Sequence, residues 1–171
     1  LKLYADRMTN ERRVEHFNII ESSVKNLTRL IDDVLIIGRV DSGRMEFAPT
    51  LLDLVPFCQS VSDEIMVALP DRAPVVFISS ATSLEAVADP RLLRQLLSNL
   101  LSNAIKFTPE NGRIELYAEV RNEEVCIRLT DNGRGIAPQF LPKLFTNFFQ
   151  VADHGVQNTG YGIGLALSKH I

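Results

Sequence analysis

The feature that most constrains the fold is a run of apolar residues spaced alternately three and four positions apart. The run consists of Phe17, Ile20, Val24, Leu27, Ile31 and Val34. In a helix this spacing puts all of them on one stripe, as in the seam of a coiled coil or helical bundle. Leu30 and Ile37 widen the stripe on one flank, as in a four-helix bundle. On this pattern alone, packing against the rest of the chain and self-association are equally supported.

The predicted helix ends at residues 41–43, where Gly43 suits the left-handed position that often closes a helix. Beyond it the periodicity changes. Residues 75–79 and 85–89 are expected to form short strands, and the alternating stretches 114–120 and 125–129 a β-hairpin with its turn at 121–123.

Helices are predicted at about residues 55–69, 91–107 and from 162 onward. The second has Asp89 as its N-cap and Pro90 at its first position. Strands and helices alternate without a regular repeat, so the predicted fold class is α+β, a two-layer sandwich with one sheet covered by helices.

Composition narrows the possible partners. With 171 residues, 46% of them hydrophobic, the chain can bury a core as one domain, or as one small domain with an appendage. The net charge is −3 without long runs of one sign, which argues against nucleic acid or an anionic membrane as partner.

No apolar run approaches the roughly 20 residues of a spanning helix. Cys58 and Cys126 are isolated, so neither a disulfide framework nor a zinc site is indicated, and a reducing compartment fits.

Polar residues line one edge of the predicted helix 91–107. The expected core stripe is Leu93, Leu97, Leu100, Ala104 and Phe107. Asn99, Asn103 and Lys106 follow at steps of four and three and share a neighbouring face. Mg²⁺ prefers oxygen ligands and takes only one or two from protein, and an amide can supply them without adding charge. Taken alone, the pattern favours a solvated polar edge over a metal site.

The segment DNGRGI follows the last predicted strand. It places Asp131 at the strand end and puts Gly133 and Gly135 where the backbone must bend closely. A turn alone would explain the glycines. In the functional interpretation the Asp131 carboxylate, which only accepts hydrogen bonds, pairs with the amino group of adenine and opposes the carbonyl of guanine.

A second glycine segment has Gly160, Gly162 and Gly164 at alternate positions before a helix. Bare backbone amides and a helix N-terminus can cradle phosphate, although the segment lacks the lysine and hydroxyl residue of a P-loop. A flexible hinge is the alternative. The preceding cluster of Phe145, Phe148 and Phe149 is expected either in the core or at the base of a movable cover. Residues Val151 to Thr159 would form this cover, the lid.

In their order and spacing, NLLSNAIKFT (99–108), DNGRGI (131–136) and GYGIGLALSKH (160–170) resemble the ATP-binding domain of sensor histidine kinases. The segment LTRLIDDVLIIGRVDSGRMEF (27–47) looks like the second helix of the dimerisation and phosphoacceptor hairpin of that family. The resemblance runs from about Glu11 to Ile171. It implies that residues 1–43 are that second helix and that residues 44–171 are a Bergerat-type ATP-binding domain, truncated before its last strands.

The resemblance assigns roles to individual residues. It implies that Asn103 binds Mg²⁺, that Asn99 lies beside the metal, and that Lys106 acts on the phosphates of ATP, so these three would carry catalysis. Asp131 would select adenine. Further nucleotide contacts are implied for Gly133, Gly135, Ile136, Phe145, Gly160, Tyr161, Gly162, Ile163, Gly164 and Leu165. Gln150 and Tyr161 stand where many relatives carry Arg and Thr, which leaves the contribution of the lid to phosphate stabilisation open.

The implied function is that of a protein histidine kinase of a two-component system. The γ-phosphoryl group of ATP would pass to a histidine on the first hairpin helix and then to an aspartate of a response regulator receiver domain. The expected partners also include a second copy of the chain and an upstream sensor domain. Cytoplasmic localisation is expected, with or without a membrane anchor elsewhere. His16, His154 and His170 all lack the acceptor-histidine signature of the family and are interpreted as structural or exposed.

Two rival functions share features with this sequence. Gyrase, mismatch-repair and chaperone ATPases have related nucleotide boxes, but those that hydrolyse ATP carry Glu at the position of Asn99, where an amide cannot act as a general base. The second rival is a degenerate kinase that serves as a nucleotide-gated dimeric scaffold. The helix with the apolar seam favours the kinase over the first rival. The presence of all three nucleotide-binding segments favours it over the second.

Overall fold

The computed structural model describes residues 9–69, 72–151 and 162–170. The chain divides into two units, Leu1–Arg44 and Met45–Ile171. In chain order the elements are α1 (Asn10–Asp41), β1 (Thr50–Asp53), α2 (Leu54–Ala68), β2 (Val75–Ser79), β3 (Glu85–Ala88), α3 (Pro90–Phe107), β4 (Ile114–Arg121), β5 (Glu124–Asp131), the 3₁₀ helix η2 (Pro138–Lys143) and α4 (Gly164–His170).

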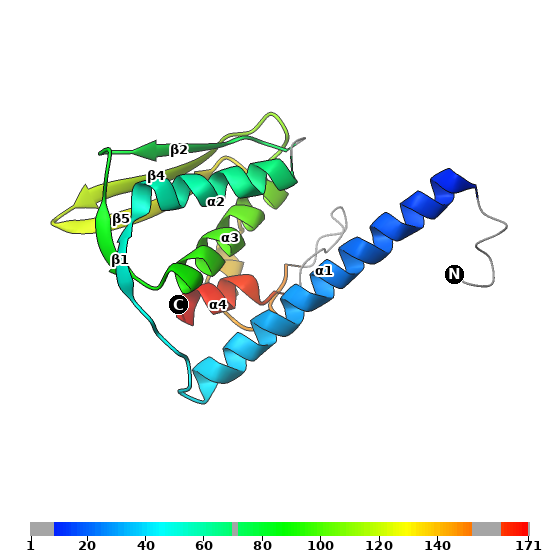
Figure 1. Cartoon of the computed structure of the whole chain (residues 1–171), viewed down its shortest axis with the longest axis horizontal. Coiled ribbons are helices and arrows are strands. Elements are labelled where there is room, and N and C mark those ends of the chain that lie inside the picture. The colour runs from blue at the N-terminus through cyan, green and yellow to red at the C-terminus, as the bar shows by residue number, and fades with distance from the viewer. Residues whose placement is uncertain (1–8, 70–71, 152–161, 171) are drawn as a thin grey trace. The chain divides into compact units, whose positions relative to one another are not determined.

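The described part of the first unit is the single helix α1, drawn in blue in Figure 1. It closes as predicted, because Gly43 is left-handed (φ 65°) and the Arg44 N–H donates to the Arg39 carbonyl at 2.8 Å. The six seam residues, from Phe17 at 60% to Ile20 at 39% exposed, are not covered by other described residues of this unit. Among the described residues, no helix combines the length and apolar character needed to cross a membrane.

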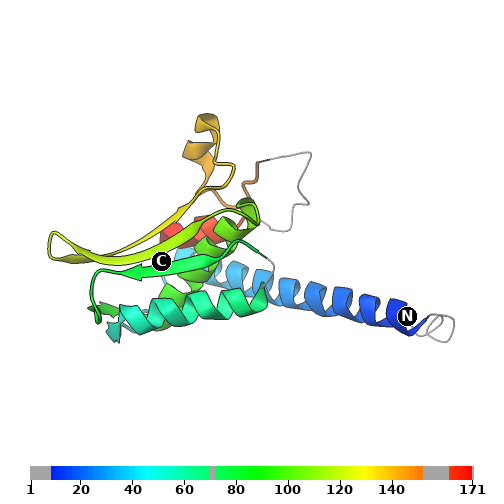
Figure 2. The same cartoon turned by 90° about the horizontal axis from the view of Figure 1, so that it is seen from above.

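The second unit contains two sheets instead of the single sheet that was predicted. Strands β2, β4 and β5 form a three-stranded sheet in which β2 is parallel to β4 and β4 antiparallel to β5. β1 and β3 form a separate antiparallel pair. The predicted strands and hairpin are all present, whereas β1 and η2 were missed. Figure 2 shows α2 on one face of the three-stranded sheet, and α2 and α3 both contact its strands.

The core lies between this sheet and helices α2 and α3. Its members include Cys58, Val61, Leu97, Leu101, Ile105, Ile114 and Leu116, all at most 2% exposed. The predicted stripe of α3 is wrong in part, because Leu100 and Phe107 are half-buried and belong to neither core cluster, whereas Leu93 is half-buried but packs against the core. The buried face instead follows Leu97, Leu101, Ala104 and Ile105, at the positions i, i+4, i+7 and i+8 of one helix face. The core face is therefore rotated towards Leu101 and Ile105.

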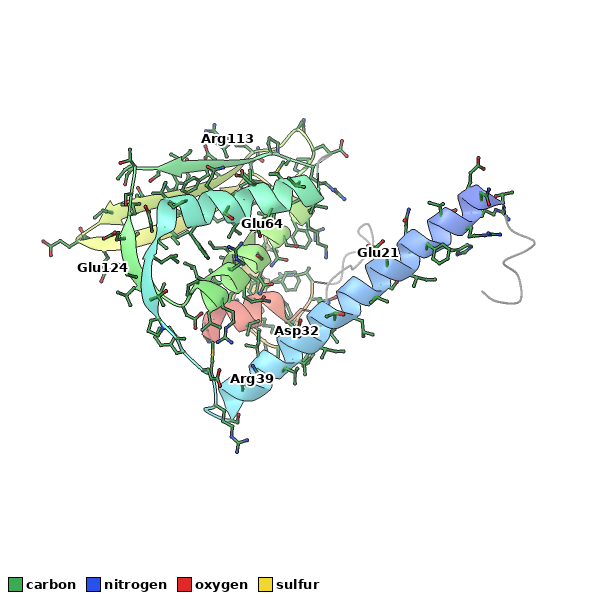
Figure 3. All side chains as sticks on the ribbon, in the orientation of Figure 1. Glu21, Asp32, Arg39, Glu64, Arg113 and Glu124 are labelled. Carbon is green, nitrogen blue, oxygen red and sulfur yellow. The ribbon has the colours of Figure 1, made fainter. Side chains whose placement is uncertain are left out.

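A charged contact joins the two helices that cover the sheet. Arg94 of α3 donates through Nη1 to both carboxylate oxygens of Glu64 on α2, each at 2.8 Å. Its guanidinium also lies 5.1 Å from the ring centroid of Phe57. Glu64, labelled in Figure 3, points from α2 towards α3. The contact fixes α3, which carries the candidate site, against its neighbour.

Asp89 anchors the start of α3 and was correctly predicted as its N-cap. Its Oδ1 accepts the backbone N–H groups of Arg91 at 3.0 Å and Leu92 at 3.3 Å, while Oδ2 accepts that of Ala48 at 2.9 Å. These bonds, that of Ala48 foremost, hold the pKa of Asp89 below its ordinary value. The Arg91 guanidinium adds a hydrogen bond to the Glu46 carbonyl at 3.0 Å. The segment before β1 is thereby tied to the first turn of α3.

Candidate nucleotide-binding site

The candidate site is built around α3. Asn99, Asn103 and Lys106 are half-buried on a face of α3 next to the core face, as their spacing predicted. They are positioned by the burial of Leu97 and Leu101 against the sheet, which fixes the rotation of the helix. One amide, a second amide and an ammonium group therefore follow one another along this face.

The second glycine segment meets α3 at Asn99. The side-chain Nδ2 of Asn99 donates to the carbonyl of Gly164, the first residue of α4, at 3.4 Å. A Cβ on Gly164 would lie 3.4 Å from Cγ of Asn99, so the backbone of α4 passes directly beside this amide. Helix α4 is held there by Ile163, Ala166 and Leu167, which are at most 2% exposed. The fold thus brings together residues of two predicted nucleotide-binding segments, 99–108 and 160–170.

The loop after β5 meets α3 at its other end. A Cβ on Gly133 would lie only 2.6 Å from the carbonyl oxygen of Phe107, so this approach requires glycine. The Arg134 N–H donates to the same carbonyl at 3.3 Å. Asn132 ties the loop to the start of β4, because its Oδ1 accepts the Arg113 N–H at 2.7 Å. Figure 3 labels Arg113 at the edge of the unit.

Asp131 lies at the end of β5, as predicted, and its side chain is exposed. One carboxylate oxygen, Oδ1, accepts the Gly133 N–H at 2.9 Å. This bond orients the carboxylate within the loop. Beyond it, Gly135 is left-handed (φ 68°) and Ile136 is 46% exposed. The loop therefore presents an oriented acceptor beside α3.

Two cations lie close to the ring of Phe107. Nζ of Lys106 lies 5.0 Å from the ring centroid and Cζ of Arg134 lies 4.7 Å from it. Burial, and to a lesser degree the charge of Arg134, lowers the pKa of Lys106. Arg134 was not among the predicted site residues, and Phe107 was predicted to lie in the core. The position of Arg134 between the two glycines of DNGRGI was the only available signal.

The phenylalanine cluster is mostly outside the core. Phe145 and Phe148 are 49% and 65% exposed, so a core role is wrong for them, while Phe149 is half-buried with its ring centroid 6.1 Å from that of Phe140. Phe148 is left-handed (φ 63°) and its N–H donates to the Gly162 carbonyl at 2.9 Å. A Cβ on Gly162 would approach the Phe149 carbonyl to 2.5 Å. This backbone contact joins the cluster to the second glycine segment.

Some predicted site residues cannot be placed. Gly160, Tyr161 and most of the predicted lid, residues 152–159, lie outside the described residues. Leu165 is half-buried at the start of α4. The nucleotide and metal roles given to all these residues, placed or not, remain predictions.

The oxygen donors on α3 fit a magnesium site in which phosphate and water supply the remaining metal ligands. In the described ranges, no group of three or more His, Cys, Asp or Glu side chains could hold a metal ion. On the polar face of α3, the amides of Asn99 and Asn103 can each offer a neutral oxygen donor. Mg²⁺ commonly takes one or two protein oxygens and completes its shell with phosphate and water, so this donor set suits it.

Comparison with known proteins identifies the class. Residues 88–171 match the family model of the histidine kinase-, DNA gyrase B- and HSP90-like ATPases. The part of the chain that holds the candidate site therefore belongs to this ATPase family, and the predicted fold class is confirmed.

Individual relatives narrow the class further. The chain is 32% identical over 154 residues to the sensor protein CreC of Escherichia coli K12, covering 90% of this chain and 32% of CreC. It is 25% identical to the histidine kinase AdeS of Acinetobacter baumannii, with a TM-score of 0.72 over 90% of this chain and 70% of AdeS. It is 28% identical to ShkA, solved in complex with AMPPNP, with a TM-score of 0.75 over 95% of this chain and 34% of ShkA. The chain thus carries a catalytic ATPase domain of the histidine kinase type and spans less than a third of CreC.

Proposed function

We propose that the chain binds ATP with Mg²⁺ and serves as the ATP-binding part of a sensor histidine kinase. The main support for this proposal is that two separate segments meet α3. The second glycine segment contacts it at Asn99, and the DNGRGI loop contacts it at Phe107. A nucleotide held there would contact the polar face of α3 and both loops at once. The AMPPNP complex of ShkA, a protein of similar fold, supports this reading.

Each proposed role follows from the chemistry of the side chain. Asp131 accepts a hydrogen bond from the adenine amino group, and Asn103 offers its amide oxygen to Mg²⁺, with Asn99 beside it. Lys106 places its positive charge on the phosphates. When bound, Mg²⁺ neutralises charge on the transferring phosphoryl group. The protein's own contribution is to position the nucleotide and to supply charge where the phosphates lie.

Asn99 favours phosphoryl transfer to a protein side chain over hydrolysis. Hydrolysis needs a base to activate water, and an amide cannot take a proton at neutral pH. A histidine acceptor needs little activation, since its ordinary pKa lies near 6.5. The proposed acceptor is a histidine on the first helix of a dimerisation hairpin, and an aspartate of a response regulator receives the group next. Rapid phosphate release from ATP by the chain, abolished in Asp131→Asn, would contradict the kinase assignment.

The proposed setting is a homodimer formed through α1 in a cytoplasmic signalling protein with an upstream sensor domain. The apolar stripe of α1 is the feature that supports the dimer. Receiver domains of response regulators are the proposed downstream partners. If the chain, joined to a hairpin helix that carries an acceptor histidine, formed no acid-labile phosphohistidine with ATP and Mg²⁺, that result would favour a nucleotide-gated scaffold instead.

The nucleotide site is tested most directly at Asp131. We expect Asp131→Asn to weaken ATP binding by roughly 30- to 100-fold, because the amide loses a charged acceptor and can turn a donor towards the adenine amino group. Titration calorimetry with ATP measures the change. The matched control is Asp63→Asn on α2, whose carboxylate accepts a bond from Gln59 and lies outside the candidate site. Equal ATP affinities for Asp131→Asn and the wild type would refute the adenine role.

The metal role is tested at Asn103. Asn103→Ala should weaken ATP binding about tenfold in the presence of Mg²⁺ and much less in EDTA, because only the metal contact is removed. Asn111→Ala, at an exposed position before β4, serves as the control. Equal losses with and without Mg²⁺ would rule out a ligand role for Asn103.

A further inference from the structure

Arg134 is the charged residue that the fold adds to the predicted site. It comes three positions after Asp131, and its guanidinium carbon lies 4.7 Å from the centroid of the Phe107 ring. The Lys106 ammonium lies 5.0 Å from the same centroid. The loop after β5 and the last turn of α3 thus bring two cations to one aromatic ring. No pattern in the sequence linked these two residues.

We propose that Arg134 is a second phosphate-binding residue of the nucleotide site, acting together with Lys106 on the phosphate chain of ATP. The proposal rests on the proposed function and names a contact that the sequence resemblance did not assign.

The backbone of the loop holds Arg134 at this place. Its own N–H donates to the Phe107 carbonyl at 3.3 Å, and the preceding Gly133 approaches that carbonyl too closely for any side chain. One residue earlier, Asn132 accepts the Arg113 N–H through Oδ1 at 2.7 Å and donates its own N–H to the Arg113 carbonyl at 3.2 Å. The guanidinium therefore starts from a backbone that is held at Arg134 itself and at the two residues before it. A residue held in this way loses less conformational freedom when it binds a ligand.

The electrostatics favour an anion between the loop and α3. Two positive charges near one ring repel each other, and Lys106 is also partly removed from water. The lowered pKa of Lys106 records both effects, with burial as the larger. A bound polyanion would relieve the repulsion and gain attraction from both groups, so the arrangement is prepared for negative charge. A guanidinium stacked on a ring can still donate from its edges to phosphate oxygens.

The phosphate chain is a better partner for Arg134 than the adenine base. Asp131, on the same loop, offers the acceptor that suits the amino group of adenine. A guanidinium has donors only and would oppose that amino group. ATP carries several negative charges on its phosphates and none on its base or ribose. Arg134 is therefore expected to distinguish ATP from adenosine.

The experiment compares ATP and adenosine binding by the 171-residue chain and its variants in titration calorimetry. Arg134→Gln should raise the Kd for ATP about tenfold, the effect of one charge-assisted contact, and leave that for adenosine unchanged. Arg134→Lys should retain part of the affinity for ATP. The control is Arg121→Gln, which removes an arginine bonded to Glu119 at the opposite end of the hairpin from Asp131.

Pairing with Lys106 gives a second measurement. Because both cations act on the same phosphates, Arg134→Gln and Lys106→Gln together should change the free energy of ATP binding by less or more than the sum of the single changes. Thermal unfolding of each variant shows that the fold is intact. Strict additivity would overturn joint action on one group.

The remaining outcomes separate the two proposals. ATP affinity unchanged in Arg134→Gln, or ATP and adenosine weakened equally, would overturn the phosphate role while leaving the nucleotide site in place. No ATP binding by the wild-type chain would overturn the proposed function and this inference together.

Discussion

At the scale of single residues, the turn of the β4–β5 hairpin stores backbone strain. Asn122 and Glu123 are both left-handed, with φ values of 52° and 67°. This two-residue turn favours Asn followed by Gly, because a side chain at the second position clashes with its own backbone. We expect Glu123→Gly to raise the free energy of unfolding by about 1 kcal/mol, measured by urea denaturation.

The control for this change is the neighbouring residue. Glu124 is the first residue of β5 and pairs with Arg121, so Glu124→Gly should lower the stability by weakening the strand. If Glu123→Gly left the urea midpoint unchanged or lowered it, the left-handed turn would be contradicted.

Single site residues differ in how far the sequence predicts them. Asp131 was predictable because it ends a strand with clear alternation, and the structure places it there. Arg134 and Phe107 were not, because their contact joins a loop to a helix end and leaves no periodic trace. Phe107 was assigned to the core from its spacing, yet it is half-buried and has two cations close to its ring. Periodicity describes one element at a time and does not report such contacts.

At the scale of elements, Asp89 joins α3 to the segment before β1. Asp89→Asn should preserve the cap, because an amide oxygen can still accept from Arg91 and Leu92. The amide nitrogen that replaces Oδ2 cannot accept from Ala48, so the partly buried Ala48 bond is lost. We therefore expect a melting temperature several degrees below that of the wild type. Asp63→Asn, at an exposed position of α2, should melt like the wild type.

The same residue predicts part of the acid stability. The pKa of Asp89 is lowered by folding, so its contribution is fully present above its ordinary pKa of about 3.9 and is lost as the pH falls through the lower, folded value. In Asp89→Asn this loss cannot occur. The stability of the variant should therefore fall less steeply than that of the wild type below about pH 4. Parallel acid denaturation curves would contradict a role for the ionised Asp89 carboxylate.

The elements themselves were largely predictable, for identifiable reasons. Helix α3 combines an N-cap, a proline at its first position and a strong apolar face, and it was predicted to within one residue at its start. Strand β1 was missed because it has only four residues and its pairing with β3 depends on distant parts of the chain. The same dependence separates β1 and β3 from the main sheet, which no local pattern reports. The buried face of α3 differs from the predicted one, and which face is buried likewise depends on the strands that the helix packs against.

At the scale of the whole molecule, the division at Arg44 and Met45 lies one residue from the predicted domain boundary at residues 43 and 44. The identity of the first unit as half of a dimerisation hairpin remains a prediction. Its physical basis is the continuous apolar stripe along α1, which no other described residue of the first unit covers. A helix of 32 residues with such a stripe gains most from a partner that buries it.

The dimer predicted from this stripe can be tested with charges in its seam. Val24 and Ile31 are 57% and 49% exposed in the single chain and lie seven positions apart on one face. In a bundle, Val24→Glu with Ile31→Glu would bury two carboxylates without partners, which costs several kcal/mol per ion. We expect the wild type to have twice the chain mass by light scattering and the double variant to have the chain mass. Asn18→Glu with Ser22→Glu adds the same charge on the opposite side of α1 and should leave the dimer intact. A double seam variant with the mass of the wild type would show that the dimer, if present, does not use this stripe.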